Sequence, residues 1–450
     1  MSPSSSPLHR HFLMLAQALD ERLGPAEDYT LWLHAEESDF VRFNHGKVRQ
    51  PGSVSQRELS LRLIQGKRHA STELSLSGVA AEDLARVDSA LARLRERVAQ
   101  LPEDPLLLWE TEGVSSVHLS PEALADGAEM TDAILEEAAL DGGVDLVGIL
   151  ASGPIYSGFA SSRGQRCWDE RRSWLFDWCL YQQGDKAVKS SVGGTGWDRS
   201  LLAQRMAEAR LALPILSRPA RRLEPGRYRA WLTPSALGEV MGLLSWGAFS
   251  HRAQEARNTP LLSMLTQGRT MDPRVSLAED LAGGLQPGFS HDGFARPERV
   301  PLIEAGALVG SLVSPRSSLE YSRAHNGASS EESPTSLNMK AGELAAGTEL
   351  EALGTGLWIS NLWYLNYSDR PAGRITGMTR FASCWVESGE VVAPAEVMRF
   401  DETVFHLLGE GLVAIGEQQS MMPDAGTYER RATASQRLPG ILVDGMRFTL

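Results

Sequence analysis

The stretch ELSLRLIQGKRHAST, residues 58–72, alternates apolar and polar side chains on both sides of a short polar step. Successive side chains of a strand point to opposite faces, so a period of two is typical of a strand with one buried face. The step Gln65-Gly66-Lys67 has the composition of a turn. The stretch therefore predicts two strands joined by a turn, and the rest of the fold can be worked out from this sheet.

The neighbouring sequence extends the sheet and adds helices to it. YTLWLH (29–34) and DFVRFN (39–44) alternate in the same way, and Asn44-His45-Gly46 supplies another turn. Apolar residues three to five positions apart predict an amphipathic helix over 79–101. Further helices are expected over 8–23, over 121–140 after a Ser120-Pro121 start, and over 198–213, with strands in DLVGILASG (145–153), SWLFDWCLYQ (173–182) and KAVKSSVGG (186–194). Residues 1–215 thus predict an α+β domain, a sheet packed with helices.

A change in composition marks the expected domain boundary. LPILSRPARRLEPGRYRAWLTP (213–234) contains two polar steps flanked by proline, which places the boundary near 215–226. Beyond it, residues 226–450 are rich in glycine and strand patterns, and they predict a β-rich domain with a curved, barrel-like sheet. The closing GILVDGMRFTL (440–450) has an Asp-Gly step between two apolar runs, which predicts a terminal β-hairpin.

Composition excludes some classes of function. A formal net charge of −13 and a pI near 5.4 argue against nucleic acid as an obligatory ligand, because phosphate binding needs clustered Lys and Arg. The sequence has no apolar run long enough for a membrane helix and no signal-peptide pattern. Its three cysteines are widely spaced, as expected for reduced thiols. We therefore expect a cytoplasmic protein.

Common catalytic signatures are missing, and one histidine pair stands out. The sequence contains no HExxH, GxSxG or P-loop. In LLSWGAFSHRAQEARNTPLL (243–262), a helix-like run, His251 and Glu255 are four residues apart and could face one metal ion. A solvated helix face is the simpler interpretation, since a zinc site needs a third protein ligand. His9 and His11 are interpreted as solvated residues of a fraying terminus.

An aromatic stretch is the best candidate for ligand binding. WISNLWYLNY (358–367) places Trp358, Trp363 and Tyr364 beside Asn361, and Arg374 and Arg380 follow. Aromatic residues are common in strands, so packing is the ordinary interpretation. The amide and the two guanidinium groups would need partners if buried, which favours a peptide-binding surface.

Five segments together resemble a known family. They are RFNHGKVRQ (42–50) with ELSLRLIQGKRHAST (58–72), ASGPIYSGFASSRGQ (151–165), DGFARPERVPLIEAGALVGSLVSPRSS (292–318), TGMTRFASCWVESGEVVAP (376–394) and LPGILVDGMRFTL (438–450). In this order they resemble the TldD/PmbA (TldE) family of metallopeptidases. The resemblance implies an α+β N-terminal domain, a β-rich C-terminal domain, and a dimer around a cleft that admits unfolded peptides.

The same resemblance implies a subunit without its own metal. Catalytic members have a His-Glu-x-x-x-His helix at the start of the C-terminal domain and a Cys ligand near the C-terminus. By alignment, Ser245, Trp246 and Ser250 occupy the three helix positions, and the last 60 residues contain no Cys. Hydroxyl and indole groups cannot replace these ligands and the base. We expect no cofactor in this chain, with zinc in a TldD-like partner, and a peptide cleft walled by Trp358, Asn361, Trp363, Tyr364 and Arg380.

Two alternatives remain open from the sequence. One is a freestanding peptide-binding or assembly protein, for example a homodimer. The other is a hydrolase with a relocated metal site that uses residues such as His251, Glu255 and His291.

Overall fold

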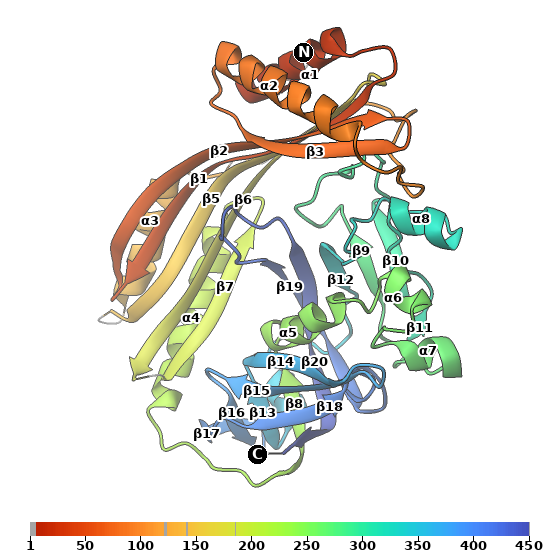
Figure 1. Cartoon of the computed structure of the whole chain (residues 1–450). Helices are drawn as coiled ribbons and strands as arrows, with labels where there is room; N and C mark the ends of the chain where they lie inside the picture. The colour runs from red at the N-terminus through yellow and green to blue at the C-terminus, as the bar shows by residue number, and fades with distance from the viewer. Residues whose placement is uncertain (1–5, 121–123, 141–142, 185, 450) are drawn as a thin grey trace.

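Two large β-sheets organise the molecule (Figure 1). The computed structural model describes residues 6–120, 124–140, 143–184 and 186–449. The first sheet has the order β3-β2-β1-β5-β6-β4, with β7 also paired to β6, and all its pairs are antiparallel except β4 with β6. Its strands are β1 (Asp28–Asn44), β2 (Lys47–Gln65), β3 (Arg68–Ser75), β4 (Ser116–Leu119), β5 (Asp145–Ser161), β6 (Arg166–Gln183) and β7 (Lys186–Gly194).

Apolar side chains at every second position of the strands form one face of this sheet, and helices cover that face. Leu59, Leu61 and Leu63 of β2 are fully buried against α1 (Pro7–Arg22) and α2 (Ala80–Val98). At the other end of the sheet, α3 (Gly127–Ala139) and α4 (Arg199–Leu216) cover a second apolar cluster. The even-numbered residues of β1 and β2 therefore lie on the opposite face, which curves toward the second sheet (Figure 1). The two turns are as expected, with Gly46 at φ +65° and Gly66 at φ +63°.

The second sheet is built from the rest of the chain. Its central order is β11-β10-β9-β12-β20-β8-β13-β16-β17, and it remains open, so the expected α+β class is confirmed while closure into a barrel is not found. Its strands are β8 (Gly226–Leu232), β9 (Leu277–Asp280), β10 (Arg299–Glu304), β11 (Ala307–Leu308), β12 (Ser336–Met339), β13 (Gly356–Ile359), β14 (Asn361–Asp369), β15 (Arg374–Arg380), β16 (Cys384–Glu387), β17 (Glu390–Pro394), β18 (Arg399–Thr403), β19 (Leu412–Pro423) and β20 (Ser435–Phe448). The helices here are α5 (Pro234–Ser245), α6 (His251–Glu255), α7 (Leu262–Gln267), α8 (Pro315–Tyr321), α9 (Glu349–Leu353) and a π-helical turn, His406–Glu410.

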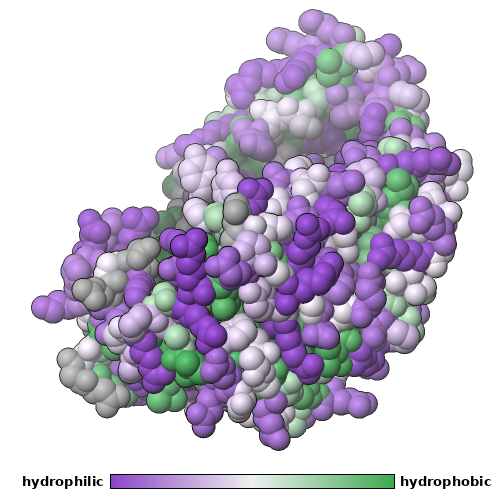
Figure 2. Space-filling model, turned by 90° about the horizontal axis from the view of Figure 1, so that it is seen from below, coloured by the Kyte–Doolittle hydropathy of each residue, from purple (hydrophilic) through white to green (hydrophobic). Residues whose placement is uncertain are grey.

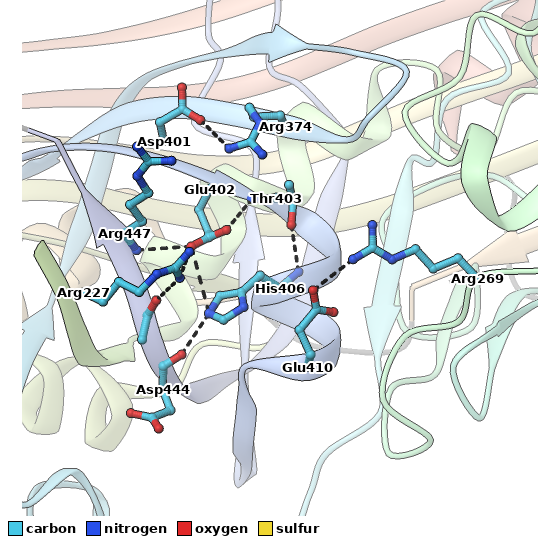
Figure 3. Close-up of polar contacts among 11 residues, drawn as sticks. Arg227, Arg269, Arg374, Asp401, Glu402, Thr403, His406, Glu410, Asp444 and Arg447 are labelled. Atoms are coloured by element: carbon cyan, nitrogen blue, oxygen red, sulfur yellow. Dashed lines mark hydrogen bonds and ion pairs between the residues drawn. The ribbon is translucent and has the colours of Figure 1, made fainter. Parts of the chain in front are cut away.

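The predicted terminal β-hairpin is wrong. β20 runs through the Asp-Gly step as one strand, and its register with β8 shifts between Val443 and Met446. Gly445, at φ +64°, therefore belongs to a β-bulge. The groups around the bulge satisfy its carbonyls, since His406 donates to the Asp444 carbonyl at 2.9 Å and Arg227 donates to that of Gly445 at 2.7 Å (Figure 3).

Two expected helices also differ from the structure. The helix predicted over 121–140 begins at Gly127, because Asp126 caps it by accepting from the Glu129 amide; residues 121–123 lie outside the described residues. The run 243–262 is not one helix, since α5 ends at Ser245 and α6 begins at His251. Gly247, at φ +88°, lies in the break between them.

The N-terminal histidines are packed rather than solvated. His9 is buried, and its ring stacks on Trp168 with centroids 4.6 Å apart. His11 contacts the buried Asp83 at 3.0 Å. The interpretation as a fraying terminus is therefore wrong for both residues.

The segment expected to separate two domains connects the two sheets. α4 continues through Pro214 to Leu216, and β8 starts the second sheet at Gly226. A loop of the second part of the chain also contacts the first sheet, since Arg62 of β2 pairs with Asp292, between β9 and β10, at 2.7 Å. The division into domains 1–215 and 226–450 stays a prediction.

The surface is mixed in polarity. On the face seen from below, hydrophobic residues occur in small groups among hydrophilic ones (Figure 2). None of the helices in the described part of the chain is both long and apolar enough to cross a membrane.

Candidate functional site

A cavity of about 760 Å³ lies between the two sheets, and we call it the inter-sheet cavity. The first sheet contributes β6 and β7, and the second contributes α5, β14 and the facing ends of β19 and β20 (Figure 1). Its polar lining includes Asp177, Lys189, Ser190, Ser191, Ser235, Glu239, Asn361, Asp424 and Gln436. These residues are far apart in sequence and meet only because the sheets face each other.

Helix α5 presents a small and polar face to this cavity. Thr233 caps the helix by accepting from the Ala236 amide at 3.3 Å, and Pro234 occupies the first turn. The residues buried in the core are Ala236, Leu237, Val240, Met241 and Leu244. Ser235, Gly238, Glu239 and Gly242 lie on the opposite side, at spacings of three and four, and line the cavity. The helix is thus amphipathic, and two glycines bring its backbone to the cavity wall.

Carboxyl groups dominate the charge of the cavity. Lys189 forms an ion pair with Asp177, which leaves Glu239 and Asp424 without a cationic partner among the lining residues. Burial by surrounding protein raises the pKa of the Glu239 carboxyl, and Lys189 offsets part of this rise. Asp424 accepts from the Gly426 amide at 2.8 Å. The cavity is therefore net acidic when these groups are ionised.

Two amide side chains in the cavity have acceptor oxygens without partners. Asn361 Oδ1 at the start of β14 and Gln436 Oε1 in β20 are both buried and accept no hydrogen bond. A Cβ atom at Gly238 would lie 3.3 Å from Gln436 Oε1, so glycine keeps the helix backbone close to this amide. Buried polar groups normally have partners. A ligand with N–H donors would supply them.

The three positions aligned with the family's metal helix do not share a helix. Ser245 ends α5 and donates to the Met241 carbonyl at 2.9 Å, whereas Trp246 caps that helix and is 62% exposed. Ser250 instead caps α6 and donates to Glu332 at 2.7 Å. The predicted common helix is wrong because the chain breaks at Gly247. That these residues bind no metal stays a prediction.

The aromatic stretch divides between three environments. Asn361 lines the inter-sheet cavity. Trp358 does not line it, because its indole packs 6.1 Å from Trp231 in an apolar cluster. Trp363 is 51% exposed, with the Arg380 guanidinium 5.1 Å from its ring centre and Tyr364 beside it. Of the five residues predicted to wall the peptide cleft, only Asn361 lines this cavity, and a role in peptide binding stays a prediction for all five.

Arg374 already has a structural partner. It pairs with Asp401 at 3.1 Å across β15 and β18 (Figure 3). This guanidinium therefore does not need a ligand to satisfy it, contrary to the expectation from the sequence.

The relocated metal site is not assembled. His251 contacts Glu255 at 3.7 Å beside one surface pocket, whereas His291 lines a different cavity of about 560 Å³. Among the described residues, no group of three or more His, Cys, Asp or Glu side chains could hold a metal ion.

The second cavity, which we call the histidine cavity, was not expected from the sequence. His34 of β1 and His291 both line it, and Trp32 stacks on His291 with centroids 4.2 Å apart. Desolvation by the surrounding protein, with a smaller contribution from nearby Arg430, lowers the pKa of each imidazole to about 4. His34 Nε2 is buried without a partner. Only the alternation of β1 could have indicated that Trp32 and His34 share a face.

Comparison with known families identifies the second half of the chain. Residues 225–450 match the family model described as the PmbA/TldA metallopeptidase C-terminal domain. The chain belongs to the PmbA/TldD family. The expectation from the five sequence segments is confirmed. Among curated proteins, no relative was found.

Solved structures of this fold align over nearly the whole chain. TldE from Thermococcus kodakarensis has a TM-score of 0.78 at 13% identity, covering 98% of this chain and 100% of its own. The "putative modulator of a DNA gyrase" from Thermotoga maritima has a TM-score of 0.75 at 13% identity, with the same coverage. A similarly described protein from Bacteroides thetaiotaomicron has a TM-score of 0.73 at 15% identity and covers 99% of each chain. At these identities the likeness shows the shared fold.

The lining of the inter-sheet cavity does not fit a zinc ion. Placed on the cavity face of α5, the His-Glu-x-x-x-His spacing falls on Gly238, Glu239 and Leu243, all three of which line the cavity. Of these three residues, only the glutamate matches the motif, because glycine and leucine have no side-chain atom that can bind a metal. The lining contains neither imidazole nor thiolate among the described residues. Glu239, Gly238 and Gly242 were missed from sequence, although their spacing opposite the apolar stripe of α5 was a usable signal.

Proposed function

We propose that this chain is the non-catalytic, TldE-like subunit of a two-subunit metallopeptidase that trims or degrades unfolded peptides. A TldD-like partner supplies the zinc and the general base. This chain holds part of the peptide in its inter-sheet cavity. We place the complex in the cytoplasm, where the free cysteines Cys167, Cys179 and Cys384 would stay reduced.

One observation carries the proposal: a cavity suited to a peptide lies on the family's scaffold without residues for a metal. Asn361 and Gln436 each offer an acceptor and a donor, as a peptide bond does. Among the described strands, β14 pairs only with β15, so its other edge has no strand partner and is the edge at which we place an added peptide strand. Asn361 and Leu365 place this strand at the cavity.

The chemistry of hydrolysis supports the division of labour. Peptide cleavage requires an activated water and stabilisation of the developing oxyanion, which a zinc ion with a carboxylate base provides. Glu239 alone lacks the ion that would activate the water. Binding and orienting the extended substrate are the functions left to this chain.

The test is cleavage of an unstructured peptide by this chain, by a partner bearing His-Glu-x-x-x-His, and by the mixture. We expect cleavage only with both chains present, and its loss on addition of a chelator. Cleavage by this chain alone that a chelator abolishes would overturn the non-catalytic role. Full activity of the partner alone would remove the proposed role as a subunit.

A further inference from the structure

The unpaired charge in the inter-sheet cavity is negative. Acceptor atoms without a protein partner include the carboxylate oxygens of Glu239, which is exposed to solvent, and the amide oxygens of Asn361 and Gln436. They come from α5, β14 and β20 and surround one space. Lys189 is the cavity's one ammonium group among the described residues, and Asp177 already neutralises it.

A neutral ligand would leave this arrangement only partly satisfied. Amide N–H groups could pair with Asn361 and Gln436, but a neutral ligand would displace water from the Glu239 carboxylate without supplying an opposite charge. Glu239 is exposed to solvent in the free chain, although the surrounding protein already raises the pKa of its carboxyl. An ammonium or guanidinium group would reverse that penalty and supply several N–H donors.

The shape of α5 leaves room for such a group. Gly238 and Gly242 lie one turn apart on the cavity side, on either side of Glu239. A Cβ atom at Gly242 would have its nearest neighbour 3.8 Å away, at Gln436 Nε2. A long, thin cationic side chain can therefore run along the helix backbone and reach the Glu239 carboxylate.

We infer that the inter-sheet cavity selects a positively charged group of the bound peptide, contributed by a Lys or Arg side chain or by an N-terminal ammonium. Glu239 is the charge partner, and Asn361 and Gln436 accept from the neighbouring N–H groups. This inference rests on the proposed peptide-binding function and adds the substrate class to it.

The test is fluorescence anisotropy of the full-length chain with three labelled, unstructured peptides of equal length. The first is blocked at both ends and has one central Lys, the second has norleucine there, and the third has norleucine with a free N-terminus. We expect the Lys peptide to bind at least tenfold more tightly than the blocked norleucine peptide. If the third peptide binds as tightly as the first, a terminal ammonium can supply the positive charge. If it binds only as weakly as the second, the charge must come from a side chain.

Matched variants assign the preference to the cavity. Glu239→Gln keeps the shape and removes the charge, so the tenfold preference should shrink to below threefold with little change in melting temperature. Glu255→Gln, at an exposed carboxylate on α6 outside the cavity, should leave the preference unchanged. Raising the salt concentration should also reduce it, because screening weakens charge pairs.

The outcomes separate the two proposals. Equal binding of the Lys and norleucine peptides overturns the cation preference and leaves peptide binding intact. A preference that survives Glu239→Gln overturns the assignment to this cavity. Binding of none of the peptides, either by this chain or by its complex with the partner, overturns both.

Discussion

His34 and His291 show how the surrounding protein shifts the pKa of a single residue. Both imidazoles line the histidine cavity, and their pKa values are lowered to about 4, chiefly by desolvation. Arg430 faces both rings, and Arg62 and Asp292 lie beside His291. The folded protein therefore binds fewer protons than the unfolded chain between about pH 4 and the ordinary histidine value of about 6.5.

We expect the contribution of these two histidines to the free energy of unfolding to be fully present above pH 6.5. It should fall as the pH is lowered toward 4. His34 contributes on the order of 2–3 kcal/mol to this loss, and His291, whose side chain is exposed to solvent, contributes less. The measurement is urea unfolding at a series of pH values. His34→Gln with His291→Gln should flatten the pH dependence, whereas His45→Gln, at an exposed turn, should not. Parallel profiles for the wild type and the double variant would contradict this prediction.

At the scale of the element, a glycine inside α5 makes the helix less stable and leaves the cavity beside it open. Gly242 lies inside the helix, where glycine is less favourable than alanine by about 0.5–1 kcal/mol. Nothing in the core requires it, because a Cβ atom there would make only an ordinary contact with Gln436 at 3.8 Å.

We therefore predict that Gly242→Ala raises stability by about 0.5–1 kcal/mol. Gly242→Phe should fill the cavity and weaken peptide binding by more than tenfold without unfolding the chain. Thermal melting and anisotropy measure the two effects. Gly268→Ala is the control, since Gly268 ends α7 at φ +63° with open space where a Cβ atom would lie, and this change should destabilise by about 1 kcal/mol. A destabilised Gly242→Ala variant would show that glycine is needed for the fold.

Strand β14 carries Asn361, which lines the inter-sheet cavity, and Trp363, whose side chain is exposed. Trp363 has the same parity as Asn361, two residues earlier, so its ring faces the same side of the strand as this cavity-lining residue, although Trp363 itself is not part of the lining. We predict that Trp363→Ala and Arg380→Ala each lower stability by less than about 1 kcal/mol, because their stacking is exposed. Each substitution should reduce the free energy of peptide binding by more than it reduces the free energy of unfolding.

Trp358→Ala is the matched control on the preceding strand. Its indole packs on Trp231, so the change should lower the melting temperature clearly and affect binding only through folding. Equal losses of stability and binding for Trp363→Ala would mark Trp363 as a packing residue.

At the scale of the whole molecule, one side chain ties the C-terminal loop to the first sheet. Arg431 is buried, and it donates to the carbonyls of Gly153 and Ser173 at 3.0 and 2.8 Å and to the Ser173 hydroxyl at 2.6 Å. Burial lowers its pKa to about 10, with the nearby Glu36 acting in the opposite direction. The loop that Arg431 anchors lies between the inter-sheet and histidine cavities, since Asp424 lines the first and Arg430 the second.

We predict that Arg431→Ala lowers the free energy of unfolding by about 2–3 kcal/mol, because it leaves buried carbonyls without a donor. Arg431→Lys should recover part of the loss. Arg430→Ala is the control, as that side chain is half exposed in its pair with Glu58 and should cost less than about 1 kcal/mol. Chemical denaturation measures all three. An Arg431→Ala variant as stable as Arg430→Ala would mean that the loop is held by other contacts.

The sequence by itself determined the features that depend on neighbouring residues. The period of two in 58–72 predicted two strands and their buried leucines, and the turn at Gly66 followed from composition. That Ser245, Trp246 and Ser250 bind no metal rests on the chemistry of their side chains alone and stays a prediction. The family resemblance belongs here too, since it rests on ordered local segments.

Only the tertiary structure decided which of these residues meet. Asp444-Gly445 has the chemistry of a hairpin turn, yet pairing with β8 holds β20 straight and makes the step a bulge. The inter-sheet cavity joins Lys189, Glu239 and Gln436, which are remote in sequence. Their convergence depends on how two sheets pack, and local periodicity contains no information on that packing. The folded surroundings also shift the pKa values of Glu239, His34 and His291, which a sequence pattern cannot reveal because desolvation depends on how the chain packs.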